Sequence, residues 1–133
     1  MKRARPLVLF VAIACLSGIA AAQQPARPPE TPEGRRQQYL GEARQLAHVL
    51  GHAHYLRLLC AGRGDQSWRD FMRQLLDREG GARRTDLIEA FNNGYRVGEE
   101  RFPSCTAGAQ AQENELKAQG LRLADTLAAR HSD

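Results

Sequence analysis

Residues 39–60, YLGEARQLAHVLGHAHYLRLLC, decide the fold of this chain. Small or apolar residues recur there in steps of three or four, namely Tyr39, Ala43, Leu46, Leu50, Ala53, Leu56 and Cys60. This spacing places them on one face of an α-helix. Upstream, Thr31-Pro32-Glu33 offers an N-cap, a first-turn proline and an early acid, so we expect the helix to begin there. Gly51 interrupts the stripe and indicates a bend or a close helix crossing.

Three further helices are expected downstream, and no segment shows the sustained alternation of a strand. Ser67 is expected to cap the second helix, and Gly80–Gly81 to end it. The third helix should begin at Thr85 or Asp86 and stop at Pro103, and Thr106 should cap the fourth. Gly94 and Gly98, four residues apart in the third helix, indicate close packing. The predicted fold class is all-α, a small four-helix up-down bundle.

The connections are short, so consecutive helices should run antiparallel. Cys60 then closes the first helix at the same end of the bundle where Cys105 opens the fourth, and we predict a disulfide between them. The expected apolar pairings are Leu46 and Leu50 with Leu123 and Leu127, and Phe71 and Leu75 with Phe91 and Tyr95.

The first 22 residues have the layout of a secretory signal peptide. Lys2, Arg3 and Arg5 precede an uncharged run over residues 7–22, which ends in three alanines. That run is shorter than the ~20 residues of a spanning helix. We expect cleavage near Gln23, with two alternatives: an uncleaved N-terminal anchor, or lipoprotein processing at Cys15. The second is disfavoured because apolar residues continue beyond that cysteine.

The predicted organisation is a signal peptide over residues 1–22, a flexible linker over 23–32 and a helical domain over 33–133. The linker is expected to be extended because it holds four of the six prolines. Cleavage changes the charge balance, since the net charge of +4 falls to +1 when three basic residues leave. A nearly neutral exported chain gives no support for nucleic-acid binding. We expect a periplasmic protein with no stable membrane span after cleavage.

Two histidines suggest a metal site. His48 and His52 lie four residues apart on one helix face, a spacing at which two imidazoles can share a metal ion. A zinc site needs at least one more ligand, and none is evident beside them. Arg44 and Tyr55 share that face, which indicates a solvated surface. We therefore predict no metal and no cofactor, and His54 lies off this face.

A second candidate is a polar cluster around Asn92, which the spacing places on the apolar side of the third helix. A buried amide needs hydrogen-bond partners. One interpretation is that Asn92 bonds to neighbouring backbone; the other is a pocket for an anionic or glycan ligand. The pocket would be lined by Arg57, Trp68, Arg69, Asn92 and Tyr95. No phosphate loop, Ser-His-Asp set or Cys-His pair is evident, so no catalytic residue is predicted.

Several segments carry a family resemblance: HYLRLLC at 54–60, WRDFM at 68–72, AFNNGY at 90–95, and Cys105-Thr106. In this order they resemble a family of short exported proteins of unknown function from Gram-negative bacteria, over roughly Tyr55 to Leu127. The resemblance implies a periplasmic helical domain with a cysteine pair and no known activity. Phe102 departs from it, because a tyrosine is expected before the second cysteine.

Two functions remain open. The first is a non-enzymatic protein of the cell envelope that binds an unidentified partner protein through a helical face. The alternative is a ligand-binding or hydrolytic domain that acts on cell-wall material through the region of Arg57, Trp68 and Asn92. An exposed apolar patch favours the first, and a deep pocket with convergent polar groups favours the second.

Overall fold

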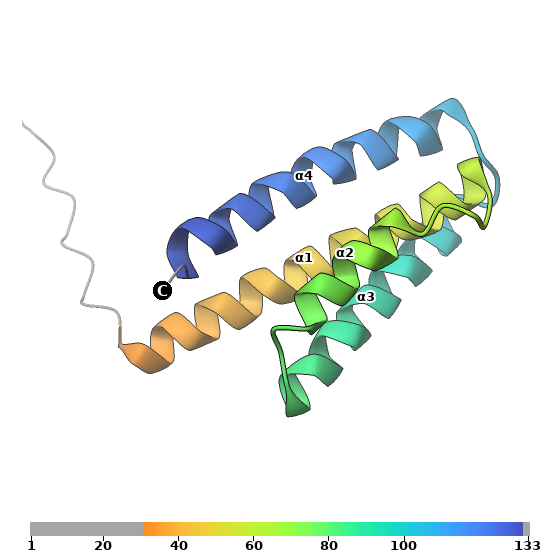
Figure 1. Ribbon diagram of the computed structural model, residues 1–133. Helices are drawn as coiled ribbons and strands as arrows, with labels where there is room; N and C mark the ends of the chain where they lie inside the picture. The colour runs from red at the N-terminus through yellow and green to blue at the C-terminus, as the bar shows by residue number, and fades with distance from the viewer. Residues whose placement is uncertain (1–30, 132–133) are drawn as a thin grey trace, which may run out of the picture.

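The computed structural model describes residues 31–131, which form four α-helices and no strand. They are α1 (Pro32–Ala61), α2 (Ser67–Leu76), α3 (Gly81–Arg101) and α4 (Ala107–His131), and they alternate in direction (Figure 1). The predicted all-α up-down fold is therefore confirmed. The predicted signal peptide, Cys15 and nearly all of the predicted linker lie outside the described residues.

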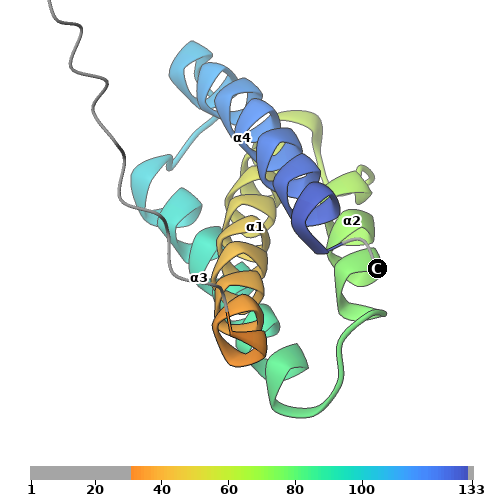
Figure 2. The ribbon, with the colours of Figure 1, turned by 90° about the vertical axis from the view of Figure 1, so that its left-hand side faces the viewer.

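Helix α1 is the centre of the molecule. Each of the other three helices packs against it, and Figure 2 shows it between α3 and α4. Within residues 31–131, the backbones of α3 and α4 make no close approach to one another, and neither do those of α2 and α4. The buried residues of the apolar stripe on α1 therefore pack against all three of the other helices. None of these helices combines the length and apolar character that a bilayer-spanning segment needs.

The tightest packing is between α1 and α3, at the glycines. A Cβ atom added to Gly51 would lie 1.9 Å from the carbonyl oxygen of Phe91, and one added to Gly94 would lie 1.9 Å from the carbonyl oxygen of His48. Each missing side chain thus makes room for the backbone of the other helix. Gly98 faces the rings of His52 and Tyr55 in the same way. The close crossing expected from these glycines is confirmed.

The core runs along α1, where Leu56 is fully buried, and it includes the fully buried Leu87 of α3. Its buried apolar members are Ala43, Leu46, Ala47, Val49, Leu50, Ala53, Leu56, Trp68, Met72, Leu76, Leu87, Ala109, Leu116 and Leu127. As expected, Leu46 faces α4, where it lies beside Gly120. The expected contact of Phe71 and Leu75 with α3 is wrong: both face the space between α2 and α4, and Met72 and Leu76 face α3 instead.

Two of the predicted helix caps are confirmed. The Thr31 hydroxyl accepts a hydrogen bond from the backbone N–H of Gly34 at the start of α1, and the Thr106 hydroxyl accepts one from Ala109 at the start of α4. Each cap satisfies one of the backbone donors that a helix start leaves unpaired.

Three predicted boundaries are wrong. Helix α2 ends at Leu76, four residues before Gly80. Ser67 is the first residue of α2 and not its cap; the carboxylate of Asp65 accepts from its backbone N–H and from its hydroxyl. Helix α3 begins at Gly81, four residues before Thr85. Gly80 is extended and Gly81 has a φ of +55°, so this pair reverses the chain early. Three good helix formers then continue the helix.

Candidate functional site

The structure divides the predicted polar cluster into two parts. Arg57 and Trp68 meet at Glu113 of α4, whereas Arg69, Asn92 and Tyr95 lie between α2 and α3. The division follows from helix geometry, because successive residues such as Trp68 and Arg69 point about 100° apart around the axis. The five residues do not form one pocket.

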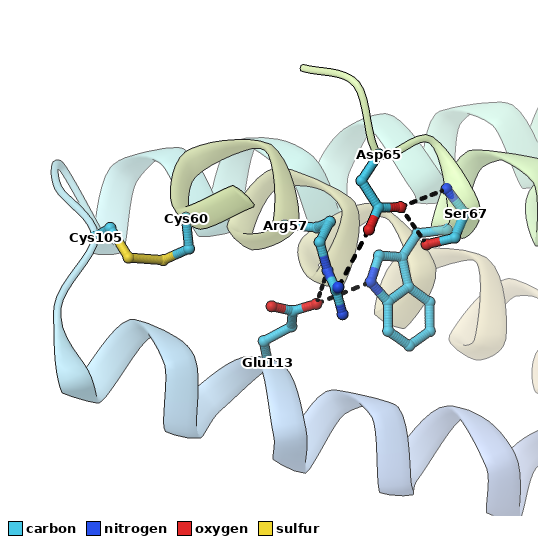
Figure 3. Close-up of polar contacts among 7 residues, drawn as sticks. Arg57, Cys60, Asp65, Ser67, Cys105 and Glu113 are labelled. Carbon is cyan, nitrogen blue, oxygen red and sulfur yellow. Dashed lines mark hydrogen bonds and ion pairs between the residues drawn. A yellow bond between two sulfur atoms is a disulfide. The ribbon is translucent and has the colours of Figure 1, made fainter. Parts of the chain in front are cut away.

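The first part is a structural network at the disulfide end of the molecule (Figure 3). The Glu113 carboxylate accepts a hydrogen bond from Arg57 Nε at 2.5 Å and another from the Trp68 indole at 3.1 Å. Arg57 also lies 3.2 Å from Asp65. Hydrogen bonds from the hydroxyl and N–H of Ser67, together with the nearby guanidinium, hold the pKa of Asp65 below its usual range. The network joins α1, the loop that follows it, the first turn of α2 and α4.

Cys60 and Cys105 form the predicted disulfide beside this network. Their Cα atoms are 5.0 Å apart, and the bridge joins the last turn of α1 to the residues that lead into α4. The shared end of the bundle expected from the sequence is confirmed.

An apolar groove lies between α2 and α4, with α1 as its floor, and we call it the α2–α4 groove. It has a volume of about 310 Å³. Its lining residues are Leu46, Leu50, Trp68, Phe71, Gln74, Leu75, Arg78, Lys117, Gly120, Leu121 and Ala124. Phe71 on one wall is 53 % exposed and Leu121 on the other is 59 % exposed. Two large apolar side chains therefore face solvent at one place on the surface.

A second hollow, the α2–α3 cleft, lies on the other side of α2 and has a volume of about 680 Å³. It contains Arg69, Asn92 and Tyr95 of the predicted cluster. Asn92 is exposed, so its expected burial is wrong. The residues of α3 that face inward are Leu87, Gly94 and Gly98, and the helical repeat turns Asn92 away from them.

The face that carries His48 and His52 is not solvated as predicted. His52 is buried against Gly98, and its ring lies 6.3 Å from that of Phe102. No group of three or more His, Cys, Asp or Glu side chains in the described residues is arranged to hold a metal ion. The buried histidines serve the packing of α1 against its neighbours.

Burial also sets the ionisation of two histidines. It lowers the pKa of His52 from the usual 6.5, and the nearby His48 and Arg101 lower it further. Burial likewise lowers the pKa of His54, where Arg69 adds to the effect and Asp65 opposes it. Both imidazoles are therefore held neutral at neutral pH.

This ionisation predicts a pH dependence of stability. The unfolded histidines titrate near 6.5 and the folded ones lower, so the unfolded state binds more protons as the pH falls. The free energy of unfolding should therefore decline as pH falls below about 6.5, measured by urea denaturation from about pH 7.5 to about pH 5. His52→Gln and His54→Gln should each flatten this slope. A slope that survives both substitutions would contradict the assignment.

The comparisons with known proteins give a family and no activity. The family model described as "Protein of unknown function (DUF2385)" matches residues 38–131. The chain belongs to the DUF2385 family. No curated protein and no solved structure matches it.

The DUF2385 match covers nearly all of the four helices, both bridged cysteines and every residue that lines the groove and the cleft. The expected membership of a family of unknown function is thus confirmed, over a longer stretch than the resemblance covered. The motif core that suggested the resemblance remains a prediction. The DUF2385 description assigns no activity. A function for this chain therefore has to be inferred from its surfaces.

Glu113 is the residue that sequence reasoning missed. It is one of fifteen acids, and no local spacing distinguishes it. Its partners Arg57 and Trp68 are 56 and 45 residues away in sequence. The sequence pattern also gives no sign of the apolar groove, because it predicts that Phe71 and Leu75 contact α3.

Proposed function

We propose that this chain is an exported, periplasmic protein of the cell envelope that acts without catalysis, by binding a partner protein in the α2–α4 groove. The observation that carries the proposal is the exposure of Phe71 and Leu121 on opposite walls of one apolar groove. Contiguous exposed apolar surface marks interaction sites in folded proteins. Export is supported by the layout of residues 1–22, and the disulfide is compatible with an oxidising compartment.

The groove fits an amphipathic helix with acidic residues along its edges. Its floor and both walls are helices, and an apolar helix face laid into such a trough is a common mode of recognition. The charged residues of the lining are Arg78 and Lys117, and no acid is among them. Complementary charge therefore calls for acidic residues on the partner, beside the apolar face.

Site-specific cross-linking in cells tests the proposal. A photoreactive residue at Gln74, on the rim of the groove, should capture a partner protein in the periplasmic fraction. The captured chain of this protein should begin near Gln23. Mass spectrometry of the cross-linked peptide should identify an acidic amphipathic helix. Phe71→Asp together with Leu121→Asp should abolish capture, since these charges face the apolar partner surface.

The doubly substituted chain should remain folded, because both side chains are more than half exposed. Ile88→Asp is the matched control: it replaces another exposed apolar residue, but one that lines the α2–α3 cleft, and should leave capture unchanged. Capture of a second copy of this chain would contradict the proposed partner. Capture that persists in the double variant would contradict the proposed surface.

A further inference from the structure

We propose that the α2–α3 cleft binds a single-chain amphiphile with an anionic carboxylate or phosphate head. The head would contact arginines from α2 and α3, and the apolar tail would lie on the floor of the cleft. This site is separate from the α2–α4 groove, so either proposal can fail without the other. The volume of about 680 Å³ falls within the range of small-molecule sites.

The α2–α3 cleft is positively charged. Its lining contains Arg69, Arg73 and Arg96 and no acid. Arg69 forms no ion pair and no hydrogen bond within residues 31–131, whereas Arg73 pairs with Asp70. A guanidinium has five N–H donors in a planar arrangement that matches a carboxylate or a phosphate. The cleft therefore offers positive charge that the described chain does not neutralise.

Arg96 is placed to share the same anion. Its Nη2 donates to the Asn93 side chain at 2.8 Å, which leaves most of its donors available. It also lines a neighbouring hollow that contains the acidic residues Asp86 and Glu89. Arg69 is for this reason the principal anchor, and Arg96 is the second.

The cleft also has an aromatic wall. His54 lines the cleft and is only 5 % exposed. Its Nδ1 atom is buried without a hydrogen-bond partner among the described residues. Because that atom is inaccessible, a ligand in the cleft contacts the ring of His54 and not its Nδ1 atom. The ring lies 5.8 Å from that of Phe91 and 6.1 Å from that of Tyr95, so it belongs to an aromatic wall.

The floor of the cleft decides the class of anion. Its apolar lining is Leu58, Met72, Leu76, Ile88 and Phe91. Ile88 is 40 % exposed at the edge. If the ligand were a fully polar anion, the apolar lining of the cleft would stay in contact with water. If it were an uncharged lipid, the arginines would have no partner on the ligand. A ligand with one anionic head and one hydrocarbon tail satisfies both, because tail burial adds favourable free energy for each methylene group.

Titrations with decanoate and decyl phosphate, kept below the concentrations at which they form micelles, test the proposal. Binding is followed by nuclear magnetic resonance. The signals of His54 and Ile88 should shift and saturate, and the indole signal of Trp68, in the other groove, should not. Saturation by both ligands, or by only one of them, supports the proposal and tells a carboxylate ligand from a phosphate ligand. Decanol should bind at least roughly tenfold more weakly than either, because it lacks the charge.

Substitutions identify the anchor. Arg69→Gln should weaken decanoate binding roughly tenfold, as expected for the loss of a charge-assisted hydrogen bond, and Arg96→Gln should weaken it less. Arg78→Gln is the matched control, because it removes the same charge from the α2–α4 groove and should leave the affinity unchanged. The proposal is overturned if decanol binds as tightly as decanoate, if Trp68 shifts in place of His54, if neither ligand saturates, or if Arg69→Gln has no effect.

Discussion

Replacing both Cys60 and Cys105 by serine should lower the free energy of unfolding by about 4 kcal/mol. The bridge joins residues 45 apart in sequence, so its loss releases a long loop in the unfolded chain. Helix α4 depends on this link, because its backbone packs on α1 and approaches neither α2 nor α3. A domain of this size has a total stability of about 5–15 kcal/mol, so the effect should be large. Urea denaturation of the oxidised wild type and the double variant measures it.

Reduction of the wild-type chain is the control, and it should lower stability to the level of the double variant. Binding to the envelope partner should then follow the fraction of folded protein and recover at lower temperature. A double variant that is as stable as the wild type but no longer binds its partner would contradict a structural role. The cysteines would then be redox-active.

The predictions from sequence that succeeded rest on local signals. Thr31 and Thr106 cap their helices through residues only three positions away, so the sequence shows both partners together. The stripe from Tyr39 to Cys60 is similarly a property of one helix. The disulfide followed from two such assignments, since it needed only the end of one helix and the start of another.

The predictions that failed depend on how each helix is rotated about its axis. Phe71 and Met72 are consecutive residues of α2. An error of about 100° in the rotation of this helix about its axis is therefore enough to exchange the surfaces that the two side chains face. The rotation of α3 is set by the approach of Gly94 to the backbone of α1, which turns Asn92 to the surface. The glycines indicated a close crossing, but they did not indicate which side chains it would turn outward.

The predicted polar cluster is divided between two places for the same reason. Arg69, Asn92 and Tyr95 line one hollow. Arg57 and Trp68 are instead bound to Glu113, a partner on a different helix. Arg57 and Glu113 are 56 residues apart, and no periodic pattern in a single sequence indicates an ion pair over that separation.

Gly51→Ala and Gly94→Ala should each lower the free energy of unfolding by about 3 kcal/mol. In an isolated helix, alanine is more favourable than glycine by about 1 kcal/mol. The expected loss of stability is therefore opposite in sign to the effect of helix propensity. The new Cβ atom would lie 1.9 Å from a backbone carbonyl oxygen in each case, and a backbone cannot move aside as a side chain can. The two helices must therefore separate along the whole crossing, which loosens the core around Leu56 and Leu87. Thermal and urea denaturation measure the loss.

Other glycines of the same chain supply the controls. A Cβ atom at Gly41 would meet nothing within 4 Å, so Gly41→Ala should raise the free energy of unfolding by about 0.5–1 kcal/mol. At Gly120 the nearest atoms would be 3.6 and 3.9 Å away, an ordinary contact, and alanine should be tolerated. Gly98→Ala should be intermediate, because the rings it would meet at 2.7 and 2.9 Å belong to side chains. If Gly51→Ala is as stable as Gly41→Ala, α1 and α3 do not cross at these residues, and the rotation of α3 that forms the α2–α3 cleft is wrong.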